Sequence, residues 1–329
     1  MNITASLSKL NDRQLRRLTT GVVVALVILV PLVAAFYWFD RHPSSGPSLA
    51  ERNIAAAEEA VRQSPNDIGA RNHLAAAYVS AGRFDDGIAQ FSQVLSAAPA
   101  DRAALLGRGL AYLAQGTLDP AKPDTAKLDK AAADFQAIVD GAKDSEFAKT
   151  DPQLEQAYYE LGVIALQLQR PADAVTNLTA ALAINGGDAD ALYSFGVALI
   201  QTNDPTKGVA ALRRAVQFVP TGWCDPYHSL QDGYTALNDA AGSQWATGMT
   251  AMCEGKLDAA ATALQPLTAG PMKIDALLGL ALVAQQRGDN TAAAGFYQQV
   301  LAIDPKNTSA SIGLGQLGLT GSPAPQGTN

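Results

Sequence analysis

This chain of 329 residues is poor in the side chains on which most catalytic and metal sites depend. It has three histidines, His42, His73 and His228, and none stands at a spacing that zinc ligands use. No G-x-S-x-G, P-loop or H-E-x-x-H motif occurs. Cys224 and His228 are near enough in sequence to be considered as a nucleophile–base pair. The helix expected there favours instead a surface or packing role for His228. We therefore expect no enzymatic activity, no cofactor, no metal and no small-molecule substrate.

Charged residues are also scarce, at 17%, and the formal net charge is −7. An acidic chain lacks the basic face that nucleic-acid binding requires, so no nucleic acid is expected as a partner. Aromatic residues make up only 6%, whereas alanine is abundant. Because alanine has the highest helix propensity and lets helices approach closely, this composition favours an all-α protein.

One long segment, 18–39, carries no charge at all between Arg17 and Asp40. As a helix it spans about 33 Å, enough to cross a hydrocarbon core of about 30 Å, and it ends in aromatic residues typical of a membrane interface. A cleaved signal peptide is the alternative, but the segment is too long for one and no A-x-A site precedes its bulky end. We predict a single-pass transmembrane helix, followed by a linker at 40–47.

The basic residues predict the orientation of this helix. Four of them precede it in segment 1–17, whereas two follow it within twenty residues. The positive-inside rule then places residues 1–17 in the cytoplasm and the rest of the chain outside it. The inverted topology, with the remainder of the chain in the cytoplasm, is the main alternative.

The most informative pattern is a repeat with a period of about 34 residues, a length typical of helical repeat units. The segments 161–165 and 195–199 stand one such period apart, and each is followed at the same spacings by small and apolar residues. The period indicates stacked helix–turn–helix units, none of which can bury its apolar face alone. The predicted solenoid, 48–319, comprises units at 68–101, 102–146 with a loop insertion at 117–127, 155–188, 189–222, 241–273 and 274–307, an extra helix at 223–240, a first capping helix at 48–64 and a last one at 308–318. A disordered tail is expected at 320–329, which is rich in Gly and Pro.

The unit 68–101 has the clearest arrangement of large, small and turn-forming residues: Leu74, Ala75, Tyr78, Gly82, Phe84, Gly87, Phe91, Leu95 and Pro99. In this arrangement it resembles the tetratricopeptide repeat (TPR) family, whose units are two antiparallel helices. The resemblance covers most of residues 50–318. It implies a right-handed all-α solenoid that binds a protein or peptide partner in its concave groove.

The resemblance also implies where such a partner would lie, namely on the first helix of each unit. The matching positions are Asn72, Leu106, Leu110, Tyr159, Val163, Tyr193, Val197, Trp245 and Met249. This mainly apolar stripe favours an amphipathic helix or an extended apolar peptide, and only Asn72 matches the subgroup that binds a C-terminal carboxylate. The alternative is that the stripe packs against neighbouring helices, since apolar residues at a period of 3.6 are more often core. Arg213 is expected to face the outer surface.

The two cysteines lie in and after the segment that breaks the repeat period. Cys224 and Cys253 are almost equally far from Asp239, at the turn between the extra helix and the next one. Antiparallel packing would bring them side by side, and the expected oxidising compartment favours a disulfide. Two buried free thiols are the alternative, because free Cys packs as a small hydrophobe.

Together these features predict a non-catalytic scaffold, tethered outside the cytoplasmic membrane by residues 18–39, that binds a peptide or protein segment. Architecturally it resembles membrane-anchored factors that assist envelope protein biogenesis or complex assembly. The alternative is a constitutive structural subunit of a larger membrane protein complex. A fold by itself carries little functional specificity, so the sequence does not identify the partner.

Overall fold

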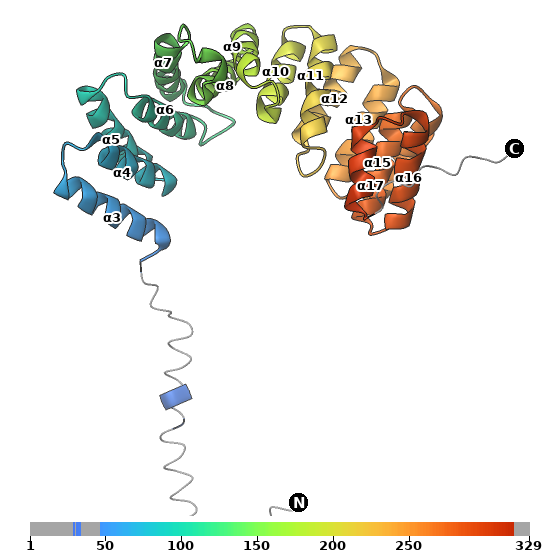
Figure 1. Ribbon diagram of the computed structural model, residues 1–329, viewed down its shortest axis with the longest axis horizontal. Coiled ribbons are helices and arrows are strands. Elements are labelled where there is room, and N and C mark those ends of the chain that lie inside the picture. The colour runs from blue at the N-terminus through green and yellow to red at the C-terminus, as the bar shows by residue number, and fades with distance from the viewer. Residues whose placement is uncertain (1–28, 30, 34–46, 319–329) are drawn as a thin grey trace, which may run out of the picture. The chain divides into compact units, whose positions relative to one another are not determined.

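The computed structural model describes Leu29, residues 31–33 and residues 47–318 (Figure 1). The predicted transmembrane segment 18–39 lies outside the described residues, apart from those four positions. Segment 1–17, most of the linker 40–47 and the tail 320–329 lie outside them as well. Among the described residues, no helix is both long enough and apolar enough to cross a membrane. The chain divides into two units, 1–60 and 61–329.

The division falls within helix α3 (Leu49–Gln63). This helix begins with a reciprocal cap, in which the Ser48 backbone N–H donates to Glu51 Oε2 at 2.7 Å and the Glu51 N–H donates to Ser48 Oγ at 3.2 Å. Such a capping box satisfies two of the backbone donors that a helix start leaves free.

The second unit is an array of helices that follow one another in antiparallel pairs (Figure 1). The pairs are α4 (Ile68–Ser80) with α5 (Phe84–Ala97), α6 (Arg102–Gly116) with α7 (Thr125–Ala142), α8 (Pro152–Gln167) with α9 (Pro171–Ile184), α10 (Ala189–Gln201) with α11 (Pro205–Phe218), α13 (Ala240–Cys253) with α14 (Leu257–Leu264), and α15 (Lys273–Gln286) with α16 (Asn290–Ile303). Helix α12 (Asp225–Ala236) interrupts the series and α17 (Thr308–Gln316) ends it, while two 3-10 turns lie at Ala148–Thr150 and Gln265–Ala269.

Aspartate defines the start of most first helices in these pairs. The N-cap residues of α4, α6, α8, α10 and α13 are Asp67, Asp101, Asp151, Asp188 and Asp239. Each carboxylate accepts a hydrogen bond from a backbone N–H two or three residues further on. A cap of this kind contributes about 1 kcal/mol, and its negative charge lies at the positive end of the helix dipole.

Helix α12 explains why the repeat period breaks at 223–240. The turn that joins it to α13 contains Asn238 at φ 56°, matching the positive φ of Gln169 and Asn203 in the α8–α9 and α10–α11 turns. Helix α13 packs against both α12 and α14. It is therefore the second helix of one hairpin and the first helix of the next.

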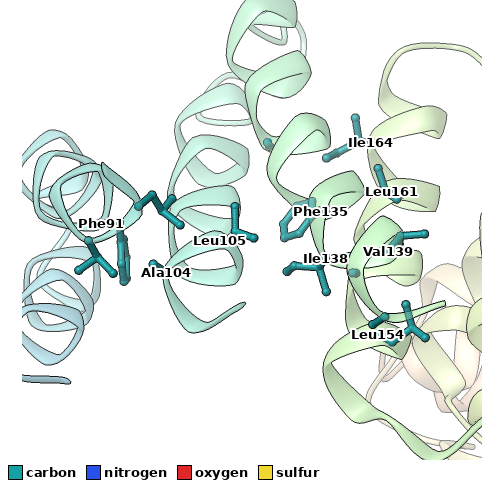
Figure 2. Packing of buried hydrophobic residues seen from close by; sticks show 14 of the residues in the cluster. Phe91, Ala104, Leu105, Phe135, Ile138, Val139, Leu154, Leu161 and Ile164 are labelled. Carbon is teal, nitrogen blue, oxygen red and sulfur yellow. The ribbon is translucent and has the colours of Figure 1, made fainter. Parts of the chain in front are cut away.

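The core of the first half is one continuous cluster (Figure 2). It runs from Phe91 on α5 through Leu105 on α6 and Phe135 on α7 to Ile164 on α8. Phe135 is fully buried against Gly109, where an added Cβ would lie 2.8 Å from the ring. Helices α6 and α7 can approach this closely because Gly109 has no side chain.

A buried ion pair crosses the same two helices. Arg108 Nε and Nη2 donate to the Asp134 carboxylate at 2.9 and 2.7 Å, and Asp134 is only 5% exposed. The hydrogen bonds to Asp134 raise the pKa of Arg108 above its ordinary value, so the guanidinium stays charged. This bidentate pair orients α6 against α7.

The core of the second half is built around Trp245 on α13. Tyr227 and Tyr234 of α12 meet its indole edge-to-face, and the Arg213 guanidinium lies 5.0 Å from the indole ring centroid. Arg213 also donates to Asp275 Oδ1 at 2.5 Å and to the Tyr234 hydroxyl at 3.0 Å. The prediction that Arg213 faces the outer surface is therefore wrong, because α12 and α15 surround it with an aromatic and a carboxylate partner.

Candidate binding cavity between helices α8 and α10

A cavity of about 900 Å³ lies over the first helices of two neighbouring pairs, α8 and α10. Its floor is formed by Tyr159 and Val163 of α8 and by Tyr193 and Val197 of α10. These are four of the nine groove positions predicted from the sequence. The two residues on each helix are one helical turn apart, so they lie on the same face of that helix. The pair on α10 occupies the same positions one repeat period later, so the two pairs lie side by side in the stacked units.

The loop inserted between α6 and α7 forms one wall of this cavity. Pro120, Ala121 and Pro123 line it, and the loop closes on itself because the Asp124 N–H donates to the Gly116 carbonyl at 2.9 Å. The sequence predicted a loop insertion at 117–127, but it contained no signal that the insertion turns toward the first helices of the next two pairs.

Trp223 lines the cavity as well and comes from the segment between α11 and α12. Its indole meets the Tyr193 ring edge-to-face, with centroids 5.1 Å apart. Sequence reasoning missed Trp223 because it lies in the segment that does not follow the repeat period.

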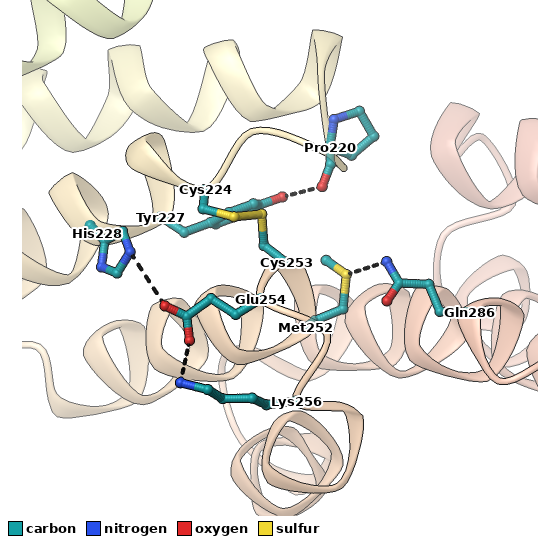
Figure 3. The surroundings of a disulfide bond; sticks show 9 residues. All are labelled: Pro220, Cys224, Tyr227, His228, Met252, Cys253, Glu254, Lys256 and Gln286. Atoms are coloured by element: carbon teal, nitrogen blue, oxygen red, sulfur yellow. Dashed lines mark hydrogen bonds and ion pairs between the residues drawn. A yellow bond between two sulfur atoms is a disulfide. The ribbon is translucent and has the colours of Figure 1, made fainter. Parts of the chain in front are cut away.

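A disulfide and a hydrogen bond hold the segment that carries Trp223 (Figure 3). Cys224 is bonded to Cys253 at the end of α13, with their Cα atoms 5.6 Å apart. On the other side of Trp223, the Pro220 carbonyl accepts a hydrogen bond from the Tyr227 hydroxyl at 2.8 Å. His228 lies 3.9 Å from Glu254, and Cys224 has no free thiol with which it could form a nucleophilic pair.

The polar lining of the cavity is mostly neutral. Gln167, Gln201 and Ser194 contribute amide and hydroxyl groups, and Asp190 is the one formally charged residue that lines it. Burial raises the pKa of both Tyr159 and Tyr193 above the usual value, and nearby carboxylates raise that of Tyr159 further. Both phenols are therefore uncharged at neutral pH and can donate or accept a hydrogen bond.

The remaining predicted groove residues lie elsewhere. Trp245 and Met249 line a second cavity of about 1100 Å³ between α11, α13, α15 and α17, where both are almost fully buried. Leu106 and Leu110 pack against the first core cluster, and Asn72 Nδ2 donates to the cap residue Asp101 at 3.0 Å. A ligand-binding role for these five residues stays a prediction. Among the described residues, no cluster of three or more His, Cys, Asp or Glu side chains could hold a metal ion.

Burial shifts the pKa of two carboxyl groups on α8 that do not line the cavity. Burial raises the pKa of Glu155 to about 7, and the neighbouring Asp188 carboxylate adds to the shift. Burial also raises the pKa of Glu160 to about 7, against a smaller opposing effect of a hydrogen bond with Gln156. Both groups are thus protonated in the folded protein at a pH where they would be ionised in the unfolded chain.

We expect the stability of the array to fall as the pH rises through 7. A carboxyl whose pKa is raised on folding stabilises the native state fully below its unfolded value of 4.5, and this contribution is lost as pH passes the folded value of about 7. The double variant E155Q/E160Q should therefore melt at a higher temperature than the wild type at pH 8 and show a flatter melting profile from pH 5 to 8. The control D173N changes an exposed carboxylate on α9 and should leave the profile unchanged. Equal slopes in the wild type and the double variant would contradict the assignment.

Paired helices stacked in register, a cavity over the first helices and an apolar floor define a helical-repeat scaffold. The family model of the tetratricopeptide repeat matches residues 72–121, 159–222 and 246–308, more than half of the chain. This chain belongs to the tetratricopeptide repeat family, and the predicted all-α solenoid is confirmed.

Comparison with solved structures shows the same fold. The chain is similar to YrrB, described as a TPR protein with an unusual peptide-binding site, at 16% identity and a TM-score of 0.50, over 64% of this chain and 99% of that one. It is also similar to the MamA protein, at 21% identity and a TM-score of 0.48, over 58% of this chain and 93% of that one. None of the curated proteins matches the sequence. At 16% identity the similarity to YrrB shows the fold alone.

Proposed function

We propose that this protein holds a segment of another protein in the cavity between α8 and α10 and performs no chemistry on it. The observation that carries this proposal is the cavity itself, which has an apolar floor, an aromatic side and a wall supplied by an insertion that the repeat does not need. Tetratricopeptide repeats are generally protein-interaction scaffolds. A cavity of about 900 Å³ accommodates several side chains of a bound peptide.

We further propose that residues 18–39 tether the array to the cytoplasmic membrane, with the N-terminus in the cytoplasm. The support is the long uncharged segment and the excess of basic residues before it. The bound segment then belongs to an envelope protein during its biogenesis or assembly. Alkaline phosphatase fused after Asn329 should be active, because it needs an extracytoplasmic location, whereas activity of a cytoplasm-only reporter at the same place would exclude this topology.

Photocrosslinking in cells tests the binding site. A photoreactive residue in place of Gln201, which is exposed and lines the cavity, is expected to form adducts with a partner. The matched control is Thr176, which is exposed on the second helix α9 and does not line the cavity. One discrete adduct from Gln201 alone would indicate a dedicated partner, and many adducts would indicate a chaperone-like role. Equal yields at the two positions, or none at Gln201, would contradict the proposal.

A constitutive subunit of a larger complex is the second candidate, because the second cavity is bordered by exposed apolar side chains. Phe218, Ile303 and Ile312 line it and are 56%, 46% and 61% exposed. Apolar residues clustered at one site often mark a permanent interface. In this case the protein purified alone should self-associate, and F218S/I312S should keep it monomeric without changing the crosslinking from Gln201.

A further inference from the structure

We propose that the segment bound between α8 and α10 carries a lysine or arginine side chain between apolar residues, and that Asp190 is the counter-ion of this cation. This inference rests on the proposed function and specifies the chemistry of its ligand.

The cavity has a negative charge and lacks a cation to balance it. Asp190 is the single formally charged residue among those that line it, and it is exposed. Further carboxylates lie nearby, since Asp188 acts electrostatically on Tyr159 and Asp225 on Tyr193. None of these three aspartates takes part in an ion pair between described residues. Lys122 is part of the inserted loop, but it does not line the cavity.

Three arginines of the array do not line this cavity: Arg170, which is exposed between the lining residues Gln169 and Pro171, and Arg102 and Arg213, which are engaged by carboxylates elsewhere. Arg102 forms two hydrogen bonds with Asp151, at 2.8 and 2.9 Å, and Arg213 pairs with Asp275. Since no Lys or Arg side chain in the described part of the chain lines the cavity, the Asp190 carboxylate is available to a cation from outside the chain. An acidic segment or a C-terminal carboxylate would instead be repelled by Asp190.

In the second half of the array a cation, an aromatic ring and a carboxylate lie together, whereas the cavity has the rings and the carboxylate but no cation from the described residues. There the Arg213 guanidinium lies over the Trp245 ring and pairs with Asp275. The cavity supplies an indole from Trp223, a phenol ring from Tyr193 and a carboxylate from Asp190. A guanidinium or ammonium group from a ligand would complete this set by cation–π contact and ion pairing.

Four of the residues that line the cavity lie on one face of helix α10. Asp190, Tyr193, Val197 and Gln201 follow one another at intervals of three and four residues, so they share one face of the helix. A cation at Asp190 would lie beside the Tyr193 ring, and its aliphatic stem and the next side chain would pack on Val197 and Val163. Gln201 and Gln167 are then placed to hydrogen-bond the ligand backbone.

Selection from a random heptapeptide library on the full-length protein in detergent tests this inference. The wild type and the control D173N should enrich Lys or Arg next to apolar residues about fivefold over the library, whereas D190N should lose this enrichment. The best peptide should bind the wild type about fivefold more weakly when its Arg is replaced by neutral citrulline, and this loss should disappear in D190N. Circular dichroism checks that each variant is folded.

The outcomes separate the two proposals. Enriched peptides that lack a basic residue, or whose basic residue is retained in D190N, overturn the cationic ligand and leave the binding cavity in place. If no selected peptide suppresses crosslinking from Gln201, the proposed binding function fails and the inference fails with it. Loss of basic residues in D173N as well would show that they respond to the overall negative charge of the protein, and this would also overturn the role of Asp190.

Discussion

The double variant C224S/C253S is expected to lower the free energy of unfolding of the second half of the array by about 3 kcal/mol. The disulfide closes a loop with a sequence separation of 29 residues, and a crosslink of this length removes much conformational entropy from the unfolded chain. Urea unfolding followed by tryptophan fluorescence measures the effect. In a W38F background the two remaining tryptophans, Trp223 and Trp245, both report on this part of the molecule.

The same variant should also weaken binding, because Trp223 lines the cavity immediately before Cys224. Hydrogen exchange should accelerate around 219–236 and remain unchanged in α5 to α7, since repeats transmit stability mainly to their neighbours. A W223A variant with the disulfide intact is the matched control, and it should weaken binding with a much smaller effect on unfolding. Full alkylation of both cysteines in the unreduced wild-type protein would contradict the disulfide itself.

The variant F135A is expected to cost about 4 kcal/mol, the largest effect of any substitution considered. Phe135 is fully buried at the centre of the first core cluster, and its removal leaves a cavity between α6 and α7 that the backbone cannot fill. The conservative variant F135L keeps most of the volume and should cost about 1 kcal/mol. Urea unfolding followed by circular dichroism measures both values, and equal losses for F135A and F135L would mean that the site repacks.

F135A should also reduce ligand binding at temperatures where the protein is still folded. The inserted loop leaves from the end of α6 and returns to the start of α7, so loosening these helices displaces Pro120 and Pro123 from the cavity. Crosslinking from Gln201 at 20 °C and 37 °C would detect this loss. An unchanged yield at both temperatures would show that the loop is held independently of the core.

Most of the fold could be predicted because it depends on local signals that recur. Aspartate caps, small residues such as Gly109 at helix crossings and turn residues such as Asn203 each act within a few positions, and the period repeats them. Four floor residues of the cavity were predictable for the same reason, since they occupy equivalent positions in two units.

The walls of the cavity could not be predicted, because they depend on contacts between segments without a period. The path of the inserted loop depends on the hydrogen bond between Asp124 and Gly116. The disulfide between Cys224 and Cys253 was predicted from the sequence, but the contact of the adjacent Trp223 with Tyr193 was not, because Trp223 has no equivalent in the repeat. The prediction that Arg213 faces the outer surface is wrong for the same reason, namely a contact with a segment outside the repeat period. A residue that faces solvent in a regular array is covered here by the helix α12, which has no counterpart in the other units.

The closure of the inserted loop has a consequence for how this protein can diversify. Because the loop starts and ends at one point of the array, where Asp124 is bonded to Gly116, its residues can be lengthened, shortened or exchanged without shifting α6 against α7. The helices then conserve the scaffold while the loop is free to vary under selection for new ligands, much as an antibody framework carries its variable loops. The segment 117–123 is thus the natural place to graft a different specificity onto an otherwise unchanged protein.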